Sequence, residues 1–176
     1  GTDLTVGLAD GHEWVGGASE AKNGIVCNAN IPTEEVFTTP HKDRISGHVR
    51  ATKPLVLAGT IIRGLEVEFR EGRAVRVDAE TGADVLRGYV AKDEGSARLG
   101  EVALVDGQGR IGPLGTVFFD TLLDENAASH IALGRAYQNC ISGCEGMDEE
   151  SFAEMGGNSS VTHLDFMIGS AEIDVD

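Results

Sequence analysis

The sequence is poor in several features that mark common protein classes. Trp, Tyr and Phe together make up only 5% of its 176 residues, and no apolar run approaches the roughly 20 residues that span a bilayer. Basic residues are also scarce, because 14 Lys and Arg stand against 29 Asp and Glu, for a formal net charge of −15. A surface this acidic repels phosphate groups, so neither nucleic acid nor a membrane surface is an expected partner.

Cysteine is scarce as well, with only Cys27, Cys140 and Cys144 present. An odd, small number favours free thiols in a reducing compartment, and hence a cytoplasmic location. A zinc site on Cys140 and Cys144 would need a second pair of soft ligands nearby in the sequence, so buried thiols are the preferred interpretation. Glycine, in contrast, is abundant at 24 residues, about twice the usual share of roughly 7%, which indicates many turns.

The length fits a single domain with its own core. The sequence starts with Gly1 rather than Met, and its alternating pattern is still running at Asp176. We therefore expect residues 1–176 to be one domain of a longer protein.

Hydrophobic periodicity predicts the main elements. Alternation predicts strands over 3–8, 101–105 and 161–168, and a hairpin over 59–78 that turns at Glu71-Gly72. Helical spacing predicts helices over 81–90, 124–134 and 148–155. Together these patterns predict a strand-rich α+β domain with a mixed or antiparallel sheet and a few short helices.

The most informative segment is 161–168. Alternation places Leu164, Phe166 and Ile168 on one apolar face, and His163 and Asp165 on the opposite face, about 7 Å apart along the strand. An imidazole and a carboxylate at this spacing can converge on one metal ion or on two adjacent ions. A solvated polar face is the alternative interpretation.

Three further segments carry candidate groups. In 124–130, carboxylates including Glu125 precede His130, and a helix continuing past Gly134 would bring Tyr137 near the same face, although helix capping by Asp124 and Glu125 explains the acids equally well. In 33–37, Glu34 and Glu35 would point in opposite directions from an extended segment, so only one could enter a site, unless both belong to a solvated loop. Glu101 opens an apolar strand, where a carboxylate lies either at the water boundary or beside a cation.

Taken together, these segments resemble the aminopeptidase T (AmpS/PepS) family of thermophilic-type metalloaminopeptidases. The similarity lies in four blocks in the same order, which cover nearly the whole chain: residues 30–40 (NIPTEEVFTTP), 99–101 (LGE), 124–137 (DENAASHIALGRAY) and 163–167 (HLDFM). The resemblance implies that residues 1–176 are the metal-binding catalytic domain of a larger two-domain protein. It also implies a preceding α/β domain, a further C-terminal edge and a homodimer.

The resemblance further implies a site for two divalent metal ions and a role for each of its residues. Glu35 resembles a ligand of one ion, Glu101 the carboxylate that bridges both, and Tyr137 the catalytic tyrosine. Glu34 is regarded as a neighbour of the site. The complete implied ligand set is Glu35, Glu101, Glu125, His130, His163 and Asp165. Carboxylates and imidazoles without thiolate suit zinc, cobalt or manganese.

The function implied is a metal-dependent aminopeptidase that removes N-terminal residues from peptides with a free N-terminus. Two adjacent ions can share and acidify a water, and the Tyr137 hydroxyl can stabilise the oxyanion. Two alternatives stay open at this point. Residues 1–176 alone could form an inactive metal-binding or dimerisation module, or the site could belong to a two-metal hydrolase of another small amide or ester.

Overall fold

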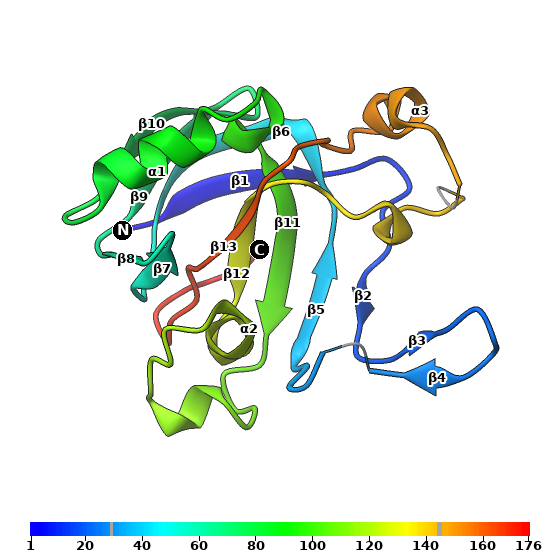
Figure 1. The fold of residues 1–176 in the computed structure, drawn as a ribbon, viewed down its shortest axis with the longest axis horizontal. Helices are drawn as coiled ribbons and strands as arrows, with labels where there is room; N and C mark the ends of the chain where they lie inside the picture. Colours follow the sequence, from blue (N-terminus) through cyan, green and yellow to red (C-terminus); the bar gives the residue numbers. More distant parts are fainter. Residues whose placement is uncertain (29, 144–145) are drawn as a thin grey trace.

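The computed structural model describes residues 1–28, 30–143 and 146–176, so a pairing of Cys140 with Cys144 lies outside the described residues. Strands dominate the chain (Figure 1). They are β1 (Asp3–Leu8), β2 (Val15–Gly16), β3 (Ser19–Glu20), β4 (Val26–Cys27), β5 (Glu35–Thr38), β6 (Pro40–Arg50), β7 (Leu55–Leu57), β8 (Thr60–Ile62), β9 (Glu66–Arg70), β10 (Arg73–Asp78), β11 (Leu99–Val105), β12 (His130–Gly134) and β13 (His163–Met167). The helices are α1 (Ala83–Val90), α2 (Thr121–Asp124) and α3 (Glu149–Glu154), with short 3-10 helices η1 (Gly95–Ala97), η2 (Gly112–Leu114), η3 (Glu125–Ala127) and η4 (Gln138–Cys140).

Two antiparallel sheets form the body of the molecule. One has four strands in the order β1-β6-β9-β10, and the other has five in the order β13-β12-β11-β5-β2. The pairs β3-β4 and β7-β8 form separate two-stranded ribbons, and β3-β4 extends away from the body (Figure 1). Every strand pair within the described ranges is antiparallel. Of the two predicted alternatives, a mixed or an antiparallel sheet, the structure therefore has the antiparallel one.

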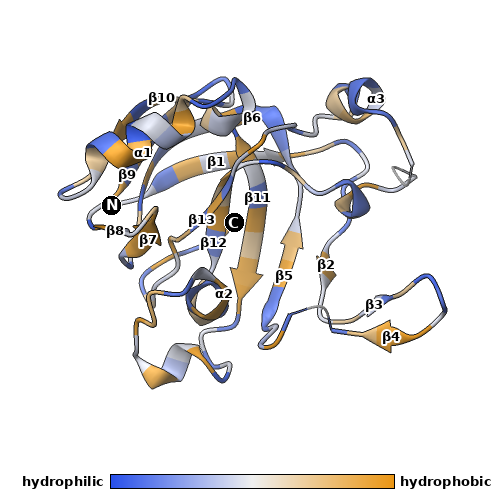
Figure 2. Cartoon of the chain, viewed as in Figure 1, coloured by the Kyte–Doolittle hydropathy of each residue, from blue (hydrophilic) through white to orange (hydrophobic). Residues whose placement is uncertain are grey.

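The main core joins one face of each sheet and also takes in Leu86 of α1. Its fully buried members from the four-stranded sheet include Ile45 and Phe69, and those from the five-stranded sheet include Ile131 and Phe166. Figure 2 shows that β11 is mostly hydrophobic along its length, whereas α1 carries both polar and apolar residues. Among the described residues, no helix is long and apolar enough to cross a bilayer, and the longest, α1, has eight residues.

Most predicted elements are confirmed, including the hairpin turn at Glu71-Gly72, the helix at 83–90 and the strand at 163–167. The helix predicted over 124–134 is wrong. The chain forms a short helix that ends at Asp124, a 3-10 turn over 125–127, and then strand β12. Asp124 precedes the 3-10 helix η3, but its side chain does not cap that helix. Its carboxylate accepts hydrogen bonds instead from the preceding N–H groups of Phe118 (2.9 Å) and Asp120 (3.2 Å).

Candidate metal centre

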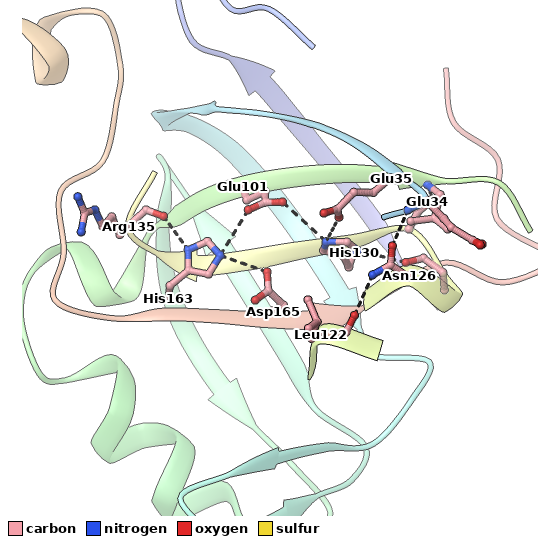
Figure 3. Close-up of polar contacts among 12 residues, drawn as sticks. Glu34, Glu35, Glu101, Leu122, Asn126, His130, Arg135, His163 and Asp165 are labelled. Carbon is pink, nitrogen blue, oxygen red and sulfur yellow. Dashed lines mark hydrogen bonds and ion pairs between the residues drawn. The ribbon is translucent and has the colours of Figure 1, made fainter. Parts of the chain in front are cut away.

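The face of the five-stranded sheet opposite the main core gathers carboxylates and imidazoles from four strands (Figure 3). Glu101 of β11 pairs with Ala132 of β12, and Ala132 pairs with Asp165 of β13, so these three residues form one row across the sheet. His130 and His163 lie in the flanking rows, opposite Ala103 and Gly134 respectively. The small side chains between them leave room for the longer polar ones.

A bulge at Gly100 places Glu101 on this face. The register between β11 and β12 shifts between Leu99 and Glu101, so Leu99 packs into the core while Glu101 faces the opposite way. Only glycine fits at this bulge, since a Cβ on Gly100 would lie 2.2 Å from the carbonyl oxygen of Arg135. The bulge therefore changes the phase of the strand immediately before the carboxylate.

The central carboxylate, Glu101, lies between the two histidines (Figure 3). Its Oε1 is 3.7 Å from Nε2 of His130, and its Oε2 is 3.4 Å from Nε2 of His163. Each histidine also lies near a second carboxylate. Oε2 of Glu35 is 3.0 Å from Nε2 of His130, and Oδ1 of Asp165 is 3.3 Å from Nε2 of His163. Each histidine thus has its own carboxylate and shares Glu101 with the other.

Both histidines turn the same nitrogen toward the site. Nδ1 of His130 lies 3.2 Å from the carbonyl oxygen of Ala128, and Nδ1 of His163 lies 2.8 Å from that of Arg135. A carbonyl only accepts, so Nδ1 carries a proton in each ring. In a neutral imidazole, the Nε2 lone pair is then available as a metal ligand.

Glu125 completes the cluster from outside the sheet. It lies in η3, directly after α2, and one of its carboxylate oxygens lies within 4.8 Å of ligand atoms of His130 and Asp165. All the sequence-predicted ligands are therefore brought together, in three overlapping groups that could each hold an ion: Glu35, Glu101 and His130; Glu101, His163 and Asp165; Glu125, His130 and Asp165.

The two adjacent glutamates diverge as the extended segment predicts. Glu35 points into the cluster, whereas Oε2 of Glu34 accepts hydrogen bonds from the N–H groups of Arg110 (2.6 Å) and Ile111 (3.3 Å). Glu34 is therefore a neighbour of the site and not a member of it. Glu35 shares a face of the sheet with Phe37, which pairs with Ala103 beside His130, and this alternation places Glu35 on the side of the cluster.

The cluster holds an excess of buried negative charge. Glu101 is 5% exposed and Asp165 is 8% exposed, and within the described part of the chain no Lys or Arg forms an ion pair with any of the cluster's carboxylates. Oε2 of Glu35 is buried and lacks a hydrogen bond of good geometry despite the nearby His130. Four carboxylates with neutral imidazoles carry a charge of about −4, which two divalent cations would balance.

The pKa values of Glu125, His130 and His163 are all raised, as expected in a cluster with an excess of negative charge. Burial and the carboxylates of Asp165 and Glu35 raise the pKa of Glu125 to about 8. Burial opposes the charged form of both histidines, but Glu101 and Glu35 raise the pKa of His130 to about 10, and Asp165 and Glu101 do the same for His163. Both sets of shifts mean that added positive charge is favoured in the cluster, and the donor set fits divalent metal ions.

Tyr137 lies at the rim of the cluster and is 39% exposed. Its ring contacts His163, with centroids 5.1 Å apart, and meets Phe37 edge to face at 5.7 Å. Partial burial and the carboxylates of Glu101 and Asp165 raise its pKa to about 12, so the phenol keeps its proton and can donate a hydrogen bond near the site.

Three supporting residues were not among those predicted for the site. Asn126 binds the backbone N–H of Glu34, beside Glu35, Tyr89 binds the backbone of His163, and Gly100 makes the bulge. A glycine directly before a lone polar residue in an apolar strand is the signal that could have indicated the bulge. Nothing in the sequence pairs Tyr89 with His163, because they are 74 positions apart.

Comparisons with known proteins identify the family of the chain. A family model described as thermophilic metalloprotease (M29) matches residues 1–176. Aminopeptidase T of Thermus thermophilus is 56% identical over all 176 residues, AmpS of Bacillus subtilis 47%, and PepS of Streptococcus thermophilus 42%. The chain spans only 43% of the length of each of these relatives.

A solved structure shows the same fold. Wild-type AmpT from Thermus thermophilus matches with a TM-score of 0.92 at 56% identity, over 98% of this chain and 42% of that one. The resemblance found in the sequence blocks is confirmed over residues 1–176, and the chain belongs to the thermophilic metalloprotease (M29) family.

Proposed function

We propose that residues 1–176 are the metal-binding catalytic domain of an aminopeptidase that cleaves N-terminal residues from peptides. Membership of a metalloprotease family implies the use of a divalent metal. The observation that carries the proposal is the buried excess of carboxylates around two histidines with Nε2 facing inward. The names of the relatives, all aminopeptidases, support the reaction class.

In this proposal, two divalent ions are held by the six clustered side chains. Glu101 would help to hold both ions, since its two oxygens face different histidines. Glu35 and His130 would hold one ion and His163 the other, while Asp165 lies within reach both of His163 and of His130 with Glu125. Zinc, cobalt and manganese all suit these oxygen and nitrogen donors. When bound, such a pair supplies Lewis acidity and a water acidic enough to attack a peptide carbonyl.

The chain's own groups perform the remaining work. A carboxylate of the cluster, Glu35 or Glu101, accepts the proton of the attacking water and returns it to the amine nitrogen as the peptide C–N bond breaks. Tyr137, protonated and partly exposed, donates a hydrogen bond to the oxyanion that forms on the carbonyl. The net charge of −15 of the chain favours the approach of a peptide's positively charged, unblocked N-terminus. The homodimer and the cytoplasmic location remain predictions from the sequence.

The direct test is hydrolysis of leucine p-nitroanilide by the complete natural protein. We expect activity that a chelator abolishes and that Co²⁺ or Zn²⁺ restores, with the N-acetylated substrate left intact. Tyr137→Phe should lower kcat by about 10²- to 10³-fold, the usual loss when one oxyanion donor is removed. Activity that survives both the chelator and Tyr137→Phe would contradict the proposal.

A further inference from the structure

Asn126 ties together two segments that carry predicted ligands. It is only 1% exposed and follows Glu125 directly in η3. Its Oδ1 accepts the N–H of Glu34 at 2.6 Å, and its Nδ2 donates to the carbonyl oxygen of Leu122 at 2.8 Å (Figure 3). Because one partner is a donor and the other an acceptor, the orientation of the amide is determined by the network.

The backbone at Glu35 pairs with only one neighbouring strand, β11, and lies at the end of β5. Glu35 is the first residue of β5, where it pairs with Val105, and β2 pairs only with Val36 and Phe37. Glu34 precedes the strand, so the sheet ladder does not fix it. Its N–H is held instead by a side chain 92 positions away.

The side chain of Glu34 is fixed as well, by the N–H groups of Arg110 and Ile111. Its backbone and its carboxylate are therefore bound to two different segments of the chain. This double attachment determines the direction in which the next residue, Glu35, leaves the loop and approaches His130.

We propose that Asn126 is a positioning residue: through its bond to the Glu34 N–H, it sets the carboxylate of Glu35 opposite His130 and Glu125. The inference rests on the proposed function, because it treats Glu35 as a ligand of a bound divalent ion. Groups that orient metal ligands commonly change metal affinity by 10- to 100-fold when they are lost.

The test is a titration of the complete natural protein with Co²⁺. Calorimetry measures the affinity for each ion, and visible absorption reports the surroundings of the bound Co²⁺. In Asn126→Ala, we expect the ion on the Glu35 side to bind about 10- to 100-fold more weakly and its absorption spectrum to change. The ion beside His163 and Asp165 should be affected less.

Thr38→Val is the matched control, because it removes another buried side-chain hydrogen bond from β5. The Thr38 hydroxyl donates to the carbonyl oxygen of Glu13 at 2.8 Å, away from the cluster. This variant should lose stability yet bind both ions with unchanged affinity. If Asn126→Ala also binds both ions like the unaltered protein, the inference is overturned while the proposed function stands.

A measurement on the unaltered protein covers the case in which Asn126→Ala does not fold. Hydrogen exchange at the Glu34 amide should be slow, and Co²⁺ should slow it further, since coupling between the bond and the ion is reciprocal. Unchanged exchange in a protein that binds two Co²⁺ ions would overturn the inference alone. A protein that binds no Co²⁺ would overturn both this inference and the proposed function.

Discussion

The hydroxyl of Tyr89 binds both backbone polar groups of His163. It donates to the carbonyl oxygen at 3.0 Å and accepts from the N–H at 3.2 Å. Because β13 is an edge strand of its sheet, these groups would otherwise have no strand partner on that side. Helix α1 thus fixes the first residue of β13, and with it a predicted metal ligand.

Tyr89→Phe should therefore destabilise the protein by about 1–3 kcal/mol, because two partly buried backbone groups lose their partner. The ring and its contact with Lys92, whose Nζ lies 4.4 Å from the ring centroid, would remain. Urea denaturation measures the loss. Lys92→Met is the control for the ring contact and should change the free energy of unfolding by less than about 1 kcal/mol. Equal stability of Tyr89→Phe and the unaltered protein would refute the role of the hydroxyl.

The bulge at Gly100 gives a second prediction. In Gly100→Ala, the new Cβ would meet the carbonyl oxygens of Arg135 and Gly134, at 2.2 and 2.4 Å, so the backbone has to shift. We expect a loss of at least about 2 kcal/mol and weaker metal binding, since the Arg135 carbonyl also orients the ring of His163.

Gly88→Ala is the matched control for that substitution. Gly88 lies in α1, and a Cβ there would meet nothing within 4 Å. The change should leave stability unaltered or raise it by up to about 1 kcal/mol, through helix propensity. Similar thermal midpoints for the two variants would show that the close approach at the bulge has no energetic consequence.

Asp93 makes stability depend on acid pH. Its carboxylate accepts hydrogen bonds from the N–H groups of Ser96 and Val161, both at 2.7 Å, and from the hydroxyls of Ser96 and Ser160. The N–H of Val161 is the largest cause of a pKa lowered to about 2, against an ordinary 3.8. This bonding attaches the segment before His163 to the loop at 93–96.

Because the pKa of Asp93 is lowered in the folded state, its contribution to the stability of the protein decreases as the pH falls. The stabilisation, about 1–2 kcal/mol after screening by solvent, is present above about pH 4 and is lost as the pH falls through about 2. Asp93→Asn should lower the urea midpoint at pH 7, and its difference from the unaltered protein should shrink between about pH 4 and 2. A difference that stays constant over this range would contradict the assigned pKa.

How much the sequence could reveal differs between elements. His163 and Asp165 were predictable, because they alternate along the strand with Leu164 and Phe166, which pack into the hydrophobic core as the alternation predicts. Strand β12 was not, because all five of its residues are buried and the four-residue spacing of Ala127 and Ile131 also fits a helix. A central strand covered on both faces lacks the alternation that separates strand from helix.

The proposed ligand set came from the resemblance, and the spatial arrangement of its residues could not be read from the sequence. Glu35 and His130 are far apart in the chain and meet only because β11 lies between β5 and β12. That strand order depends on which edges pair, and local patterns do not encode it. The supporting contacts of Asn126 and Tyr89 depend on the same long-range pairing.

Removal of metal should lower the thermal stability of the protein. Without cations, the buried carboxylates of Glu35, Glu101, Glu125 and Asp165 repel one another, and a ligand that binds only the folded state stabilises it by mass action. We expect a chelator to lower Tm, and stoichiometric Zn²⁺ or Co²⁺ to restore it. A Tm that is identical with and without chelator would show that the cluster is stable without ions.

The most direct test of the central claim is the number of divalent ions bound per chain, measured by elemental analysis of the dialysed, metal-reconstituted protein. The proposed centre predicts about two ions per chain, a loss of one in Glu35→Gln, and the loss of both in Glu101→Ala. Fewer than one ion in the unaltered protein, or two ions retained in Glu101→Ala, would contradict a two-metal centre bridged by Glu101.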